Sequence, residues 1–61
     1  MKPTVTFVGE DGNIFNLLGI ARRALRDAGQ IEKVKEMSDR VMSSDSYNAA
    51  LIVMMEYVEV R

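Results

Sequence analysis

Hydrophobic and polar residues follow two different periods along this chain of 61 residues. In residues 4–8, Thr-Val-Thr-Phe-Val, β-branched and aromatic residues alternate, which predicts a half-buried strand. From Ile14 the apolar residues recur at intervals of three and four, which predicts a helix that reaches about Ala28. Asn13 is well placed as the N-cap of this helix, and Gly29 can end it in a left-handed conformation.

A second helix is predicted over residues 31–42 by a narrower apolar stripe, which consists of Ile31, Val34, Met37, Val41 and Met42. Glu36 and Arg40 lie four residues apart on it and are expected to pair. The segment Ser-Ser-Asp-Ser at residues 43–46 then interrupts the pattern and offers several N-caps for a third helix that begins at Tyr47.

Two features of the sequence predict where the third helix ends, namely its acidic residues and an alternation of apolar and polar residues. Glu56 and Glu59 would oppose the dipole at a helix C-terminus, and residues 57–60 alternate like a strand. We therefore expect the helix to end near Glu56 or Tyr57 and a short strand to follow. This strand could pair with residues 3–8, whose backbone groups need partners, although a second subunit could also supply them.

Together these elements predict one α+β domain over residues 1–61, in the order β-α-α-α, with a short C-terminal strand beside the N-terminal strand. A chain this short buries only about 60% of the surface that its unfolded form exposes. The residues expected in its core are Val5, Phe7, Ile14, Leu17, Leu18, Ala21, Leu25, Val34, Val41, Leu51 and Met54.

The composition argues against several kinds of chemistry. The chain has no cysteine and no histidine, so it can form neither disulfides nor thiolate metal sites, and it lacks the usual general base at neutral pH. Its serines have no histidine to activate them, and its carboxylates are scattered. We therefore expect a protein that is not an enzyme, with no catalytic residues, no metal site and no cofactor.

Charge and hydropathy indicate which partners and which cellular location to expect. The net charge is −1, whereas a nucleic-acid binder usually carries a positive surplus. The longest apolar run, residues 49–55, is far shorter than the roughly 20 residues of a membrane-spanning helix, and the start of the chain does not resemble a signal peptide. These features predict a soluble cytoplasmic protein with no membrane contact.

The acidic glycine turn Gly-Glu-Asp-Gly-Asn at residues 9–13 could suggest a ligand loop. A phosphate loop would need a lysine instead of two adjacent carboxylates, and a calcium loop would need oxygen ligands over about a dozen residues. Asp11 and Asn13 are only a fragment of that calcium pattern. The sequence favours a turn followed by a helix cap.

A stripe of four residues runs along one side of the first helix and allows two interpretations. Phe15, Gly19, Arg22 and Arg26 recur at four, seven and eleven residues. They could form a docking edge, because aromatic residues and arginine are frequent at binding hot spots. The sequence favours the other interpretation, in which Phe15 tucks under the N-terminal strand, Gly19 permits close packing and the arginines are solvated.

The third helix is apolar nearly all round. Ile52, Val53 and Met55 lie off its expected core face, and a helix of this kind should be buried on nearly every side. So small a chain cannot easily do that alone. Ile52 and Met55 are therefore predicted to bind a partner, either a second copy in a homodimer or another protein, through a surface on the first and third helices.

Nucleic acid remains the alternative partner. Arg22, Arg23 and Arg26 cluster near the end of the first helix and could contact phosphates. A helix-turn-helix is disfavoured, because residues 31–42 would present a neutral face to the groove.

The stretches VGEDGNIFNLLGIARRALRDAG and SYNAALIVMMEYVEV resemble a group of short uncharacterised bacterial proteins whose genes tend to lie in prophages and mobile elements. The turn and the helix that follows it carry most of this resemblance. It implies a bacterial cytoplasmic setting and a host or phage partner, and it brings no activity with it.

Overall fold

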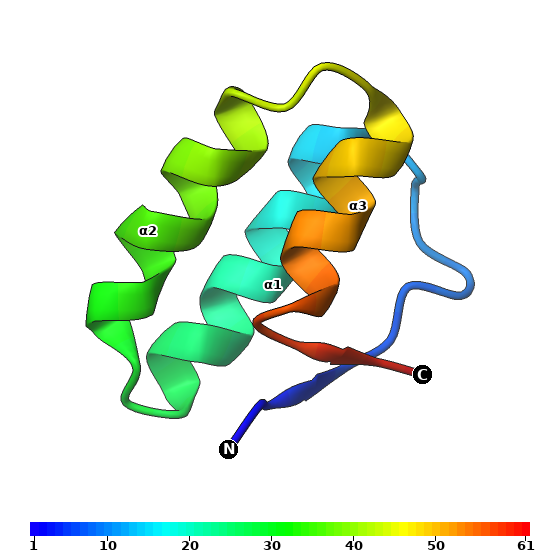
Figure 1. Cartoon of the computed structure of the whole chain (residues 1–61). Coiled ribbons are helices and arrows are strands. Elements are labelled where there is room, and N and C mark those ends of the chain that lie inside the picture. The colour runs from blue at the N-terminus through cyan, green and yellow to red at the C-terminus, as the bar shows by residue number, and fades with distance from the viewer.

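Three helices pack against one another, and two short strands lie side by side at one end of them (Figure 1). The structure is a computed structural model that describes residues 1–61. Its elements are β1 (Thr4–Val5), α1 (Ile14–Asp27), α2 (Ile31–Met42), α3 (Tyr47–Met55) and β2 (Glu59–Val60). The two strands are parallel, with Thr4 opposite Glu59 and Val5 opposite Val60. The predicted α+β fold and the pairing of the two ends of the chain are therefore confirmed.

The first helix begins and ends as its sequence predicts. The Asn13 side chain accepts a hydrogen bond from the Phe15 amide at 2.8 Å, which satisfies one free N–H of the first turn. Gly29 has a φ of +75°, and its amide donates to the Arg26 carbonyl. The Gln30 amide donates to the Leu25 carbonyl. These two bonds form a Schellman motif, which uses the carbonyls that the helix end leaves free.

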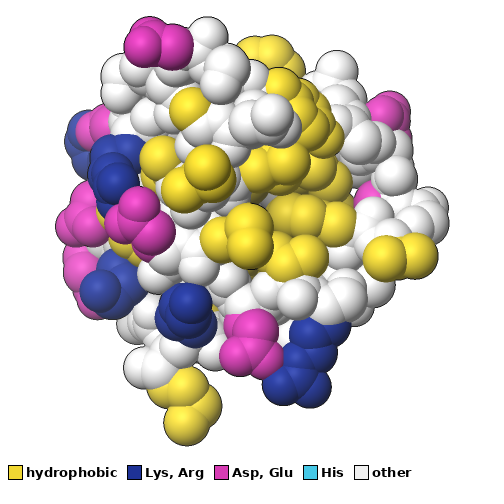
Figure 2. Space-filling view, turned by 45° about the vertical axis from the view of Figure 1, so that its right-hand side comes forward, with side chains coloured by type: hydrophobic (Ala, Val, Ile, Leu, Met, Phe, Trp, Pro, Cys, Tyr) yellow, Lys and Arg dark blue, Asp and Glu magenta, His cyan; other side chains and the backbone are white.

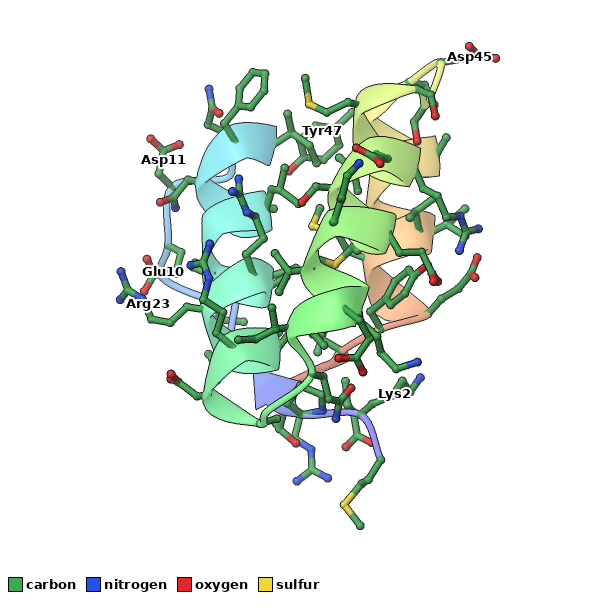
Figure 3. The ribbon with its side chains drawn as sticks, turned by 90° about the vertical axis from the view of Figure 1, so that its left-hand side faces the viewer. Lys2, Glu10, Asp11, Arg23, Asp45 and Tyr47 are labelled. Atoms are coloured by element: carbon green, nitrogen blue, oxygen red, sulfur yellow. The ribbon has the colours of Figure 1, made fainter.

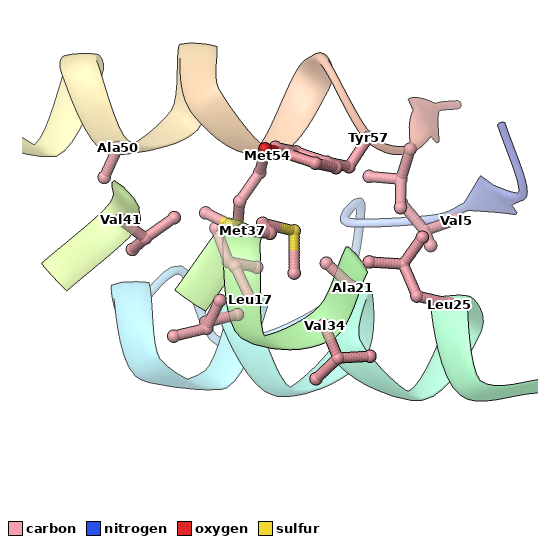
Figure 4. Packing of buried hydrophobic residues seen from close by; sticks show 12 residues of the cluster. Val5, Leu17, Ala21, Leu25, Val34, Met37, Val41, Ala50, Met54 and Tyr57 are labelled. Carbon is pink, nitrogen blue, oxygen red and sulfur yellow. The ribbon is translucent and has the colours of Figure 1, made fainter. Parts of the chain in front are cut away.

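One core unites the three helices and both ends of the chain (Figure 4). Met37 of α2 lies between Met54 of α3 and Leu17 of α1. Every residue predicted for the core packs in it, although Phe7, Ile14 and Leu51 are only partly buried. The buried residues absent from the predicted set are Met37, Ala50, Tyr57 and Val58.

The N-terminal strand is shorter than the alternation predicted. Only Thr4–Val5 pairs, because β2 is itself two residues long and offers no further partner. The chain turns away after that, since the Glu10 amide donates to the Phe7 carbonyl, and Val8 is largely exposed.

The C-terminal segment also differs in part. The third helix ends at Met55, with Glu56 as its cap, close to the predicted end. Tyr57 and Val58 are both buried in the turn that follows, and only Glu59–Val60 forms a strand. Two adjacent residues of a regular strand would point to opposite faces, whereas a turn lets both reach the core.

The stripe predicted for the second helix is buried only in its middle. Val34, Met37 and Val41 are in the core, whereas Ile31 and Met42, at the two ends of α2, remain exposed. None of the three helices is long and apolar enough to pass through a bilayer.

Candidate functional site

The strongest candidate for a binding surface is the outer face of α3. This helix has no charged residue in its nine positions, and it buries Ala50 and Met54 towards α1 and α2. Ile52 and Met55 lie on the other side and keep 62% and 53% of their surface exposed. Apolar side chains form a patch in the middle of this side of the molecule, and most charged side chains lie to its left and below it (Figure 2).

The shape of the molecule explains why this face stays open. Its shortest extent is 15 Å, and a helix with its side chains is about 10 Å across. A layer can therefore cover α3 on one side only. The outer face, which we call the α3 face and define by Asn48, Ile52 and Met55, is thus left to solvent in the single chain.

The stripe on α1 is not packed in the way that the sequence favoured. Phe15 does not tuck under the N-terminal strand, because 64% of its surface is exposed. A Cβ atom added at Gly19 would meet nothing within 4 Å, so this glycine does not serve close packing either. The packing interpretation is wrong for these two residues. Arg22 is half-buried and Arg26 is exposed, which agrees with a solvated face.

The six candidate residues for partner binding lie on two helices. Helices α1 and α3 both bury their inner faces in the same core. Ile52 and Met55 lie on α3, and the four residues of the stripe follow the outside of α1.

A polar cluster that the sequence did not predict joins α2 to the end of α3. The Arg40 guanidinium donates to both carboxylate oxygens of Glu56, at 2.7 and 3.0 Å. It also donates to the Tyr57 hydroxyl at 3.2 Å and lies 5.7 Å from the centre of that ring. The Tyr57 hydroxyl in turn donates to the Glu36 carboxylate. The expected pair between Glu36 and Arg40 does not form, because each of them binds a residue of the C-terminal segment instead.

The charges in this cluster shift one another's pKa values. Hydrogen bonds from Arg40 lower the pKa of Glu56, against a smaller opposing effect of desolvation. Hydrogen bonds to Glu56 and then to Tyr57 raise the pKa of Arg40. Burial raises the pKa of Tyr57, and its bond to Glu36 adds to this. The hollow beside the cluster, of about 340 Å³, is lined by groups that largely satisfy one another, as expected of a structural link.

The acidic turn at residues 9–13 is organised as a turn and cap. A side-chain oxygen of Asp11 accepts a hydrogen bond from the Asn13 amide at 3.0 Å. The backbone carbonyl of Asp11 accepts one from the Asn16 side chain at 2.8 Å. No group of three or more acidic side chains is close enough to hold a metal ion. Glu10 lies on the side of α1 that carries Arg23, and both line a shallow hollow next to Gly19 (Figure 3).

Three comparisons were made with known proteins. No protein-family model matches the chain, and no match is found among curated proteins or among solved structures. The geometry described above is therefore the basis for assigning a function.

Proposed function

We propose that this protein is a small, non-enzymatic interaction module of the bacterial cytoplasm that associates with itself through the α3 face. The observation that carries this proposal is the exposure of Ile52 and Met55 on a helix without a single charged residue. Apolar side chains aligned on one uncharged surface helix are typical of a protein interface.

The simplest arrangement is an antiparallel pair of α3 helices around a two-fold axis. Most small homo-oligomers are two-fold dimers, in which the same patch on each copy faces the other. Asn48, Ile52 and Met55 follow one another along the outer side of the helix at intervals of four and three residues. Ile52 is the middle one of the three, so it lies closest to the axis and contacts the same residue of the second copy.

The surface area available on α3 limits the affinity of the dimer. A stable interface covers about 800 Å² on each partner. The whole chain exposes 4047 Å², so a stable dimer would cover about a fifth of its surface, more than one nine-residue helix offers. We therefore expect a dissociation constant in the micromolar range or weaker.

Cross-linking tests this arrangement directly, because the natural chain has no cysteine. Under mild oxidation, Ile52→Cys should form a disulfide-linked dimer in high yield. Ile31→Cys is the matched control, since Ile31 is equally exposed but lies on α2. Light scattering at several hundred micromolar should give a mass above that of the monomer for the natural chain and the monomer mass for Ile52→Lys. Equal cross-linking of both cysteines, with a monomeric natural chain, would refute self-association.

A second candidate function is binding of nucleic acid through the end of α1. Arg22, Arg23 and Arg26 lie within five residues of one another, and none of them takes part in an ion pair. Three free guanidinium groups could replace phosphate counterions, so binding would weaken steeply with salt. Retention of the natural chain on a nucleic-acid column at low salt, lost at moderate salt and in an Arg22→Gln, Arg23→Gln, Arg26→Gln variant, would favour this candidate. No retention at low salt would reject it.

A further inference from the structure

A second apolar surface lies at the end of the molecule where α1 and α3 begin and α2 ends. A pocket of about 280 Å³ opens there, and its apolar lining residues are Ile14, Phe15, Val41, Met42, Tyr47 and Ala50. Phe15, Met42 and Tyr47 keep 64%, 63% and 47% of their surface exposed. The pocket is therefore bordered by large apolar side chains that the chain itself does not cover.

The charge that lines this pocket is negative. Asp45 is the only charged residue that lines it, and Asp45 takes part in none of the ion pairs. A cationic group of a ligand can therefore pair with the Asp45 carboxylate at the rim of the pocket.

Hydrogen bonds hold the elements around the pocket in place. The Tyr47 hydroxyl donates to the Gly12 carbonyl at 2.5 Å, which ties the start of α3 to the acidic turn. Asp11, Tyr47 and Asp45 all lie at this end of the molecule (Figure 3). A site whose walls are fixed before binding loses little entropy when a ligand enters.

The size of the pocket indicates what fits it. At about 30 Å³ for each water molecule, its volume equals that of about nine waters. Small-molecule sites usually begin at about 300 Å³ and enclose most of their ligand. An open pocket of 280 Å³ suits one large side chain better than a cofactor.

We propose that this pocket, distinct from the α3 face, docks a segment of another protein in which a large apolar side chain is followed by a lysine or arginine. The apolar side chain fills the space between Phe15, Met42 and Tyr47. The basic residue lies at the rim and pairs with Asp45.

Two-dimensional NMR of the ¹⁵N-labelled protein tests this proposal with defined probes. The peptide Gly-Ser-Leu-Arg-Ser-Gly should shift the amide signals of residues that line the pocket, with saturation in the millimolar range, because it inserts a single side chain. Replacing its leucine by alanine should abolish the shifts. Replacing its arginine by glutamate should weaken binding about threefold, the effect of an exposed ion pair. If the leucine peptide causes no shifts at the pocket, or if the alanine peptide causes equal ones, the proposal is wrong.

Two protein variants separate this pocket from the α3 face. Met42→Lys puts a cation on the rim at an exposed position, so it should abolish binding of the leucine-arginine peptide and leave the circular dichroism spectrum unchanged. Asp45→Asn should remove the preference for arginine over glutamate; an unchanged preference would overturn the role of Asp45. Ile52→Lys should leave the peptide shifts unaltered while it lowers the molar mass. A failure of the pocket can thus be distinguished from a failure of self-association.

Discussion

The Glu56 carboxylate connects the end of α3 to α2 through Arg40, and this link depends on pH. Its pKa in the folded protein is lower than in the unfolded chain, because Arg40 holds the ionised form by two hydrogen bonds. A group whose pKa is lowered by folding stabilises the fold above its unfolded value. That stabilisation disappears as the pH falls through its folded value.

We therefore predict that Glu56→Gln reduces the acid sensitivity of the protein. Between about pH 6 and pH 3, the free energy of unfolding of the natural chain should fall more steeply than that of Glu56→Gln. Urea denaturation at a series of pH values measures both slopes. Glu10→Gln serves as the control, because Glu10 takes part in no ion pair, and it should keep the slope of the natural chain. Identical slopes for the natural chain and Glu56→Gln would show that the link does not contribute.

The same side chains show which contacts could not be predicted from the sequence. Spacing along a helix suggests that Glu36 pairs with Arg40, because residues four apart are neighbours on its surface. In the structure Arg40 binds Glu56, sixteen residues further on, and Glu36 binds Tyr57. These contacts depend on how α2 and α3 pack, which no local pattern specifies. Tyr57 and Val58 were missing from the predicted core for the same reason.

The helices themselves follow local rules closely. Two glycines, one inside α1 and one just after its C-terminal end, test those rules in opposite directions. Gly29 ends the helix with a φ of +75°, a conformation that costs other residues about 1 kcal/mol or more. Gly19 lies inside the helix at an exposed position, where alanine is better by about 0.8 kcal/mol. An added Cβ atom has free space at both positions, so backbone conformation alone decides the outcome.

We therefore predict that Gly29→Ala lowers the free energy of unfolding by about 1 kcal/mol and that Gly19→Ala raises it by a similar or slightly smaller amount. Urea denaturation at one pH, with equal slopes for all three proteins, measures the two changes. Each variant is the control for the other, because both add the same methyl group, one within α1 and one just after its end. Changes of the same sign would mean that packing, and not the backbone, governs these positions.

Helix boundaries were predictable because caps and glycines act on their immediate neighbours, as Asn13 and Gly29 do. The length of the N-terminal strand was not predictable. Residues 4–8 carry the alternation of a five-residue strand, but a strand extends only as far as its partner does, and β2 ends the pairing after two residues. The stripe on α1 was misjudged for a related reason. Periodicity places Phe15 and Gly19 on one side of the helix, but it does not say whether another element covers that side.

At the scale of the whole molecule, small size limits how much apolar surface the protein can cover. Its three helices and two strands enclose one core, and the 15 Å thickness leaves no second layer to cover α3. If a second copy covers the α3 face, folding and association are linked, because a partner that binds only the folded form stabilises it. The stability of the protein then depends on its concentration.

We predict this dependence in thermal unfolding. Where the dimer predominates, each tenfold rise in concentration contributes half of 1.4 kcal/mol, or about 0.7 kcal/mol, for each chain. The entropy of unfolding for a chain of this length is about 0.13 kcal/mol per kelvin, so the melting temperature should rise by about 5 °C for each tenfold step. Scanning calorimetry from about 0.1 to 1 mM measures it. Ile52→Lys should show no such rise, whereas Ile31→Lys, with the same substitution on α2, should behave like the natural chain. A melting temperature of the natural chain that is constant over this range would mean that the α3 face remains open to water in a stable monomer.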